Sequence, residues 1–69
     1  MRFPKDFRKN GNHYFLQGTK VCIIQWNTGK NKNFIVEKYD NRTNPITIPG
    51  KGDEAMIKAI EMAYKMANM

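Results

Sequence analysis

The chain has 69 residues, so it forms one small domain with a single core and no deep cleft between two domains. It holds one cysteine and one histidine, Cys22 and His13, which excludes an intrachain disulfide and a zinc site built from Cys and His. The formal net charge is +6, and a positive charge of this size favours polyanionic partners, either nucleic acid or an acidic protein surface.

The net charge lies entirely in the first half of the sequence. Residues 1–36 hold seven basic residues and one acidic residue, a net charge of +6, whereas residues 37–69 hold five of each. The N-terminus is charged and has no apolar signal segment, and no apolar run approaches the roughly 18 residues of a membrane span. We therefore expect a cytoplasmic, reducing location, without membrane contact, metal or cofactor.

Residues 1–12 are predicted to form a basic N-terminal arm. Phe3 and Phe7 alternate with basic residues there, Pro4 opposes regular strand pairing, and Asn10-Gly11 is a turn signal. Because the two phenylalanines are four residues apart, we expect them to pack one helical turn of the arm onto the domain.

Strands are predicted at residues 13–17, 19–26 and 33–39, because these runs are rich in aromatic and β-branched residues. Residues 27–32 are expected to form a turn between the second and third strands. Residues 46–48 add a short edge strand, closed by Pro49-Gly50.

The hydrophobic period changes from two to 3.6 after residue 53, which predicts a helix running to the C-terminus. Its apolar stripe consists of Met56, Ala59, Ile60, Ala63 and Ala67. The expected class is α+β: a small antiparallel meander of three to four strands, then one helix packed on one face. Residues 13–69 then form a single β-β-β-α domain.

Alternation along the strands gives the sheet two apolar faces, of which one helix can cover only one. The first face carries Tyr14, Leu16, Val21, Ile23, Phe34 and Val36. The second carries Phe15, Cys22, Ile24, Trp26, Ile35 and Tyr39. We expect the helix on the first, more aliphatic face, so the second needs the arm, a second copy of the chain or a ligand.

The order of three strands and a helix over residues 13–68 resembles the small DNA-binding domains of tyrosine integrases and of plant ethylene-response factors. The resemblance is one of architecture and rests on no shared motif. It implies a sheet that presents side chains to the major groove of DNA.

The sequence predicts a non-catalytic protein that binds nucleic acid, with DNA expected over RNA. Basic residues would hold phosphates, and Trp26, Phe15 or Tyr39 would stack on bases. The predicted binding residues are Arg2, Lys5, Arg8, Lys9, Lys20, Trp26, Lys30 and Lys32. The aromatic residues are also explained as ordinary core, and Cys22, inside an apolar run, is expected to be buried and inert.

Two alternatives to nucleic-acid binding stay open at this point. One is a module or inhibitor that binds an acidic protein, of the sort encoded by phages or plasmids. The other is a homodimeric structural protein whose second sheet face is its own interface.

Overall fold

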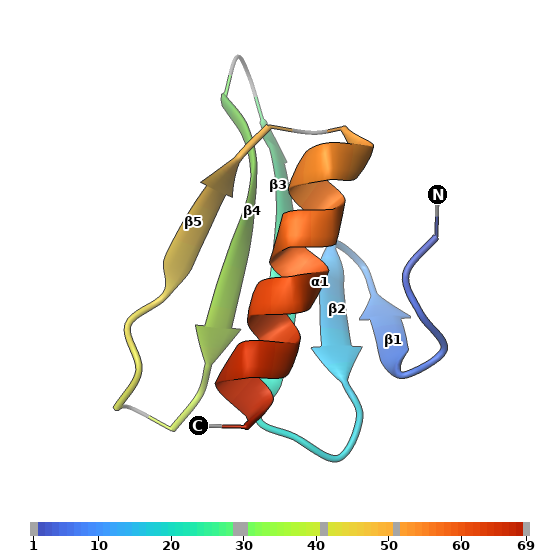
Figure 1. Cartoon of the computed structure of the whole chain (residues 1–69). Coiled ribbons are helices and arrows are strands. Elements are labelled where there is room, and N and C mark those ends of the chain that lie inside the picture. Colours follow the sequence, from blue (N-terminus) through green and yellow to red (C-terminus); the bar gives the residue numbers. More distant parts are fainter. Residues whose placement is uncertain (1, 29–30, 41, 51, 69) are drawn as a thin grey trace.

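The computed structural model describes residues 2–28, 31–40, 42–50 and 52–68 (Figure 1). One antiparallel sheet holds the strands in chain order, and a single helix follows. The elements are β1 (Phe7–Asn10), β2 (His13–Leu16), β3 (Val21–Thr28), β4 (Asn31–Lys38), β5 (Ile46–Pro49) and α1 (Asp53–Ala67). The α+β class, the meander and the C-terminal helix are confirmed, but the sheet has five strands rather than three or four.

The additional strand, β1, lies in the segment that the sequence predicts as an arm, and the helical turn expected from Phe3 to Phe7 is wrong because Phe7 begins this strand. Phe7 pairs with Leu16 across the β1–β2 hairpin, and Gly11 takes a φ of +64° in the turn, a conformation that favours glycine. Phe7 is the one buried side chain of β1, because the next three residues are exposed. Because three of its four residues are polar and exposed, the hydrophobic pattern of the sequence does not predict this strand.

The β3–β4 hairpin is longer than predicted. Its register runs from Val21 opposite Lys38 to Thr28 opposite Asn31, so each strand extends into the segment expected to be a turn. Cross-strand pairing carries the ladder two residue pairs beyond the apolar core, although asparagine is a poor strand former.

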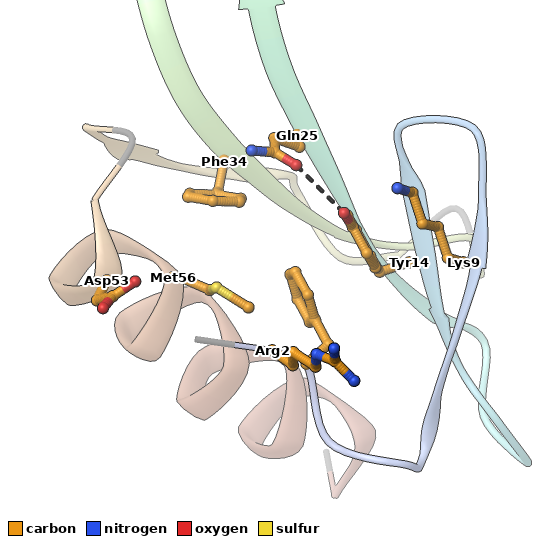
Figure 2. A pocket seen from close by; sticks show the side chains of 8 residues that line it. Arg2, Lys9, Tyr14, Gln25, Phe34, Asp53 and Met56 are labelled. Carbon is orange, nitrogen blue, oxygen red and sulfur yellow. Dashed lines mark hydrogen bonds between the residues drawn. The ribbon is translucent and has the colours of Figure 1, made fainter.

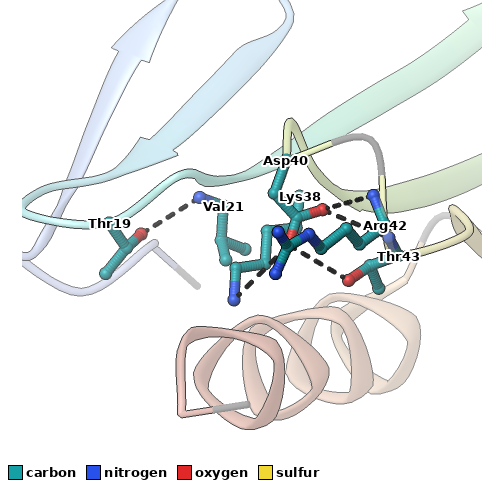
Figure 3. A network of polar contacts seen from close by, with 6 residues as sticks. All are labelled: Thr19, Val21, Lys38, Asp40, Arg42 and Thr43. Carbon is teal, nitrogen blue, oxygen red and sulfur yellow. Dashed lines mark hydrogen bonds and ion pairs between the residues drawn. The ribbon is translucent and has the colours of Figure 1, made fainter.

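The connection from β4 to β5 is fixed by Asp40 (Figure 3). Its carboxylate accepts hydrogen bonds from the backbone N–H groups of Arg42 (3.0 Å) and Thr43 (3.1 Å), and Lys38 Nζ lies 3.8 Å away. The backbone hydrogen bond from Arg42 is the main cause that lowers the pKa of Asp40 below its usual value. This turn sets where β5 begins.

Helix α1 begins after the N-cap Gly52 and crosses β3, β4 and β5. Asp53 and Glu54 lie in its first turn, where the helix dipole favours negative charge. Its buried residues are Ala55, Met56, Ala59, Ile60, Ala63 and Met66. Most of the predicted stripe is thus confirmed, with Met66 buried more completely than Ala67.

The helix packs on the first sheet face, as predicted. That face supplies the fully buried side chains of Val21, Ile23, Phe34 and Val36, and together with the helix they form the core. No helix in the described part of the chain has the length and apolar character needed to traverse a bilayer.

The segment before β1 packs on the same side of the sheet as the helix. The Phe3 ring stacks on Tyr14 at a centroid distance of 3.8 Å and lies 5.4 Å from the Phe7 ring. Phe3 also meets Phe34 edge-on at 6.5 Å. This segment, described from residue 2 to residue 6 and called the arm from here on, therefore adds to the first face and does not cover the second.

We expect Gly50→Ala to lower the free energy of unfolding by about 1–3 kcal/mol, because an L side chain there is strained. Gly50 has a φ of +110°, and an added Cβ would lie 3.2 Å from the Cβ of Ala55. Gly52→Ser is the matched control, since nothing lies within 4 Å of its added Cβ and its φ is −81°. Serine is also a good N-cap, so urea denaturation should find the control at least as stable as the parent protein. Equal stability of the two variants would contradict the assigned backbone conformation.

Candidate nucleic-acid interface

The sheet face opposite α1 is called the open face from here on. The strand register arranges its side chains in rows across the sheet: Arg8, Phe15, Cys22 and Glu37 in one, Asn10, His13, Ile24, Ile35 and Thr47 in the next, then Trp26 and Asn33. The set of apolar residues is the one that alternation predicts. No helix or strand of the described residues packs over this face (Figure 1).

Aromatic rings give the open face its character. Trp26 is 45% exposed and Tyr39 is 48% exposed. The Phe15 ring lies between His13, stacked at 5.8 Å, and Tyr39, edge-on at 6.3 Å. Ile24 and Ile35 are half-buried at the centre of the face. A contiguous apolar surface that no other element covers is typical of an interaction site.

Cys22 lies under this surface and is only 1% exposed. Its Sγ donates a long hydrogen bond of 3.7 Å to Glu37 Oε1. Burial, followed by the negative charge of Glu37, raises the pKa of the Cys22 thiol to about 12. Burial also raises the pKa of Tyr39, followed by the charges of Cys22 and then of Glu37. The thiol is therefore protonated and a poor nucleophile at neutral pH.

The open face carries few charges. Arg8 projects from β1 in the row of Phe15. Lys20 comes directly before β3, and its carbonyl accepts a hydrogen bond from Tyr39 N, so it continues the alternation onto this side. Glu37 is the acidic residue of the same region, with its carboxylate at Cys22. The two basic residues border the aromatic surface at the end where Phe15 and Tyr39 lie.

The other predicted binding residues lie elsewhere. Arg2 and Lys9 line a cavity on the helix side of the sheet (Figure 2). Lys5 is exposed in the turn before β1, and Lys32 belongs to the β4 positions that alternate toward the helix side. Lys30 lies outside the described residues. The structure thus places Arg8, Lys20 and Trp26 on the same face of the sheet, with the two basic residues at one end and Trp26 at the other, and it places Arg2 and Lys9 on the opposite side.

Two residues of interest escaped the reading of the sequence. Glu37 was not recognised as an acidic group on the open face, although the alternation of β4 places it there. Gln25 is a polar residue inside an apolar strand, and it faces the helix side at the cavity. An amide within an apolar run is the signal that could have revealed this cavity.

Asn33 is the cross-strand neighbour of Trp26 on the open face. Its side-chain Oδ1 is buried and has no hydrogen-bond partner among the described residues. An unpaired buried acceptor costs about 1–3 kcal/mol, so this residue lowers the stability of the face.

Within the described residues, no group of three or more His, Cys, Asp or Glu side chains is placed to hold a metal ion. Comparisons with protein-family models, curated proteins and solved structures find no match to this chain. The chemistry of the open face is therefore the guide to its function.

We expect Asn33→Val to raise the free energy of unfolding by about 1 kcal/mol or more, because it removes the unpaired acceptor and suits a strand better. Chemical denaturation measures the change. Asn44→Val, in the exposed loop before β5, is the control and should have little effect. A loss of stability in Asn33→Val would show that Oδ1 is paired in solution.

We expect Cys22 to react very slowly with iodoacetamide at pH 8, and its rate to rise about tenfold per pH unit, following the thiolate fraction. Glu37→Gln should speed the reaction, because it removes the negative charge that raises the pKa of Cys22. Mass spectrometry follows the alkylation, with the protein unfolded in urea as the fully reactive control. Rapid labelling of the folded protein at pH 8 would contradict both the burial and the raised pKa.

Proposed function

We propose that this chain binds single-stranded nucleic acid on the open face of its sheet. The observation that carries the proposal is the exposure of Trp26 and Tyr39 on a face that no element of the described chain covers. Every base has a flat π-face, and stacking on an aromatic side chain contributes about 1–3 kcal/mol per base. An aromatic sheet surface with basic residues at its border is how several single-strand binders work.

The positions of the rings suit a short strand running along β3 and β4. Tyr39 lies level with Lys20 and Trp26 lies six residues further along β3, a separation of about 20 Å at the usual rise per residue. Ile24, Ile35 and Phe15 lie between the two ends. A track of this length accommodates a few nucleotides, the low end of site sizes for single-strand binding.

The width of the sheet favours a single strand over the groove of a duplex. Five strands at the usual spacing are about 19 Å across, whereas the major groove is about 12 Å wide. The resemblance to three-stranded DNA-binding domains implies insertion into that groove, and the two additional strands make such insertion difficult. The amino-acid sequence predicts DNA over RNA, so the binding assay compares a DNA strand with an RNA strand of the same base sequence.

We expect Trp26→Ala to weaken binding of a short single-stranded DNA by about tenfold, the loss of one stacked base. Binding should quench Trp26 fluorescence in the parent protein, and anisotropy of a labelled strand should measure the affinity of the variant. Tyr64→Leu is the aromatic control, because Tyr64 is 37% exposed on the helix, away from the open face.

Salt dependence tests the charge assignment in the same assay. Two phosphate contacts, through Arg8 and Lys20, predict a slope of log K against log salt of about −1.4. Absence of binding at low salt would overturn the proposal. So would tighter binding to duplex DNA, or an equal loss in Tyr64→Leu.

A homodimer through the open face is a second candidate, and a specific arrangement favours it. The row from Arg8 to Glu37 has a cation at one end and a carboxylate at the other. Two sheets packed face to face about a two-fold axis parallel to the strands would place Arg8 opposite the Glu37 of a second copy. Complementary charges of this kind fix the register of an interface.

Charge reversal separates the two candidates. A dimer predicts that Arg8→Glu and Glu37→Arg each lower self-association, and that the double variant restores it in sedimentation equilibrium. Nucleic-acid binding predicts a monomer throughout, with Glu37→Arg binding the strand more tightly. A dimer restored in the double variant would replace the first proposal.

A further inference from the structure

An open cavity of about 520 Å³ lies on the helix side of the sheet, away from the open face (Figure 2). The arm contributes Arg2 and Phe3 to its wall, the sheet contributes Tyr14 and Phe34, and α1 contributes Met56. Ligand sites for small molecules commonly have volumes of about 300–1,000 Å³. The cavity is therefore large enough for a ligand of the size of a nucleotide.

Opposite charges lie on opposite sides of this cavity. Figure 2 shows Asp53 and Met56 on one side, and Lys9 with Tyr14 on the other. Arg2 belongs to the arm, so two cations share the cavity with one carboxylate. A ligand that matches them has an anionic group at one end and a hydrogen-bond donor at the other.

The wall between the charged ends is apolar or aromatic, with Phe3, Phe34 and Met56 around it. Gln25 is the amide in this wall, and its Oε1 accepts a hydrogen bond of 3.3 Å from the Tyr14 hydroxyl. That bond uses the amide oxygen, so the amide nitrogen is the group that can donate to a ligand. A flat heterocycle with acceptor nitrogens suits this lining.

We infer that this cavity binds a nucleoside 5′-phosphate whose base carries an exocyclic amine, such as AMP. Arg2 and Lys9 hold the phosphate, since guanidinium and ammonium groups are the common phosphate ligands of proteins. Phe3 and Tyr14, the two rings of the lining that are only partly buried, contact the base, and the Asp53 carboxylate accepts a hydrogen bond from the exocyclic amine. The Asp53 carboxylate would repel a simple anion placed beside it, so a simple anion is a poorer match to this cavity than a nucleotide.

The inference goes beyond the binding of a strand on the open face and does not depend on it. The two sites use different residues on opposite sides of the sheet. Nitrogen–proton correlation spectra distinguish them. A ligand in the cavity shifts the backbone amide signals of Phe3, Gln25 and Phe34, whereas a ligand on the open face shifts the indole N–H signal of Trp26. Each site can therefore fail without the other.

The test is a titration of the whole chain with AMP and with IMP, followed by calorimetry and by nitrogen–proton correlation spectra. AMP and IMP differ only in the exocyclic amine, which IMP replaces with a carbonyl. We expect AMP to bind about tenfold more tightly than IMP, the value of one hydrogen bond to a charged group. Inorganic phosphate should bind more weakly than either, because it lacks the base.

Variants assign the roles of the charged side chains. Asp53→Asn should abolish or reverse the preference for AMP, because an amide can donate to the carbonyl of IMP, and Glu54→Gln should leave the preference unchanged. Lys9→Gln should weaken both nucleotides by about two- to fivefold, the value of an exposed ion pair, while Lys65→Gln, at the other end of α1, should not.

Three results would overturn the inference. They are equal affinity for AMP and IMP, shifts that cluster at Trp26 instead of at the cavity, and an equal loss in Lys9→Gln and Lys65→Gln. The correlation spectrum of each variant also reports whether it is folded, so a lost preference in a folded Asp53→Asn protein still counts.

Discussion

The packing of one helix on a sheet that is apolar on both faces is the constraint on which the rest of this structure depends. Ala59 and Ala63 have no exposed surface, and such small side chains let α1 approach the strands closely. That contact buries the first face almost completely, with Ile23 and Val36 at its centre. A helix of this length cannot reach around the sheet, so the apolar surface of the open face stays in contact with water. Exposure of this kind costs free energy in proportion to its area, and a partner on the open face recovers part of that cost.

The position of the arm is the second consequence of this packing. Phe3 lies against Tyr14, on the helix side, because the helix and the first face already form an apolar corner there. The open face lacks such a corner, since its rings lie on a plain sheet surface. Because the arm packs in this corner, it leaves the open face uncovered and forms one wall of the cavity. The basic residues are divided in the same way. Arg2, on the arm, lines the cavity, whereas Arg8, in β1, lies on the open face.

Much of this arrangement was accessible from the sequence because side chains alternate strictly along a strand. Alternation alone separates the two faces of β3 and β4, and the more aliphatic composition of the first face favours it as the side that the helix covers. β1 was missed because a strand with one buried residue, Phe7, has no hydrophobic pattern to detect. The cavity could not be predicted at all, since it depends on where the segment before β1 folds back, and the stacking of Phe3 on Tyr14 is a contact between segments that no local rule specifies. The division of the charges could not be predicted either, because the basic residues form one cluster in the sequence and two groups in space.

The two candidates for the open face are linked by mass action, because a strand and a second copy would occupy the same surface. Anything that binds the free monomer face lowers the population available to the other ligand. If copies associate, the apparent affinity for a strand must fall as the protein concentration rises, and a pure strand binder shows no such dependence. Glu37 bears on the outcome through its charge: beside a phosphate backbone it is repulsive, whereas opposite an Arg8 of a second copy it is attractive. Under these two proposals, the balance between the two terms, more than the exposed aromatic area that both candidates share, decides between a strand and a second copy.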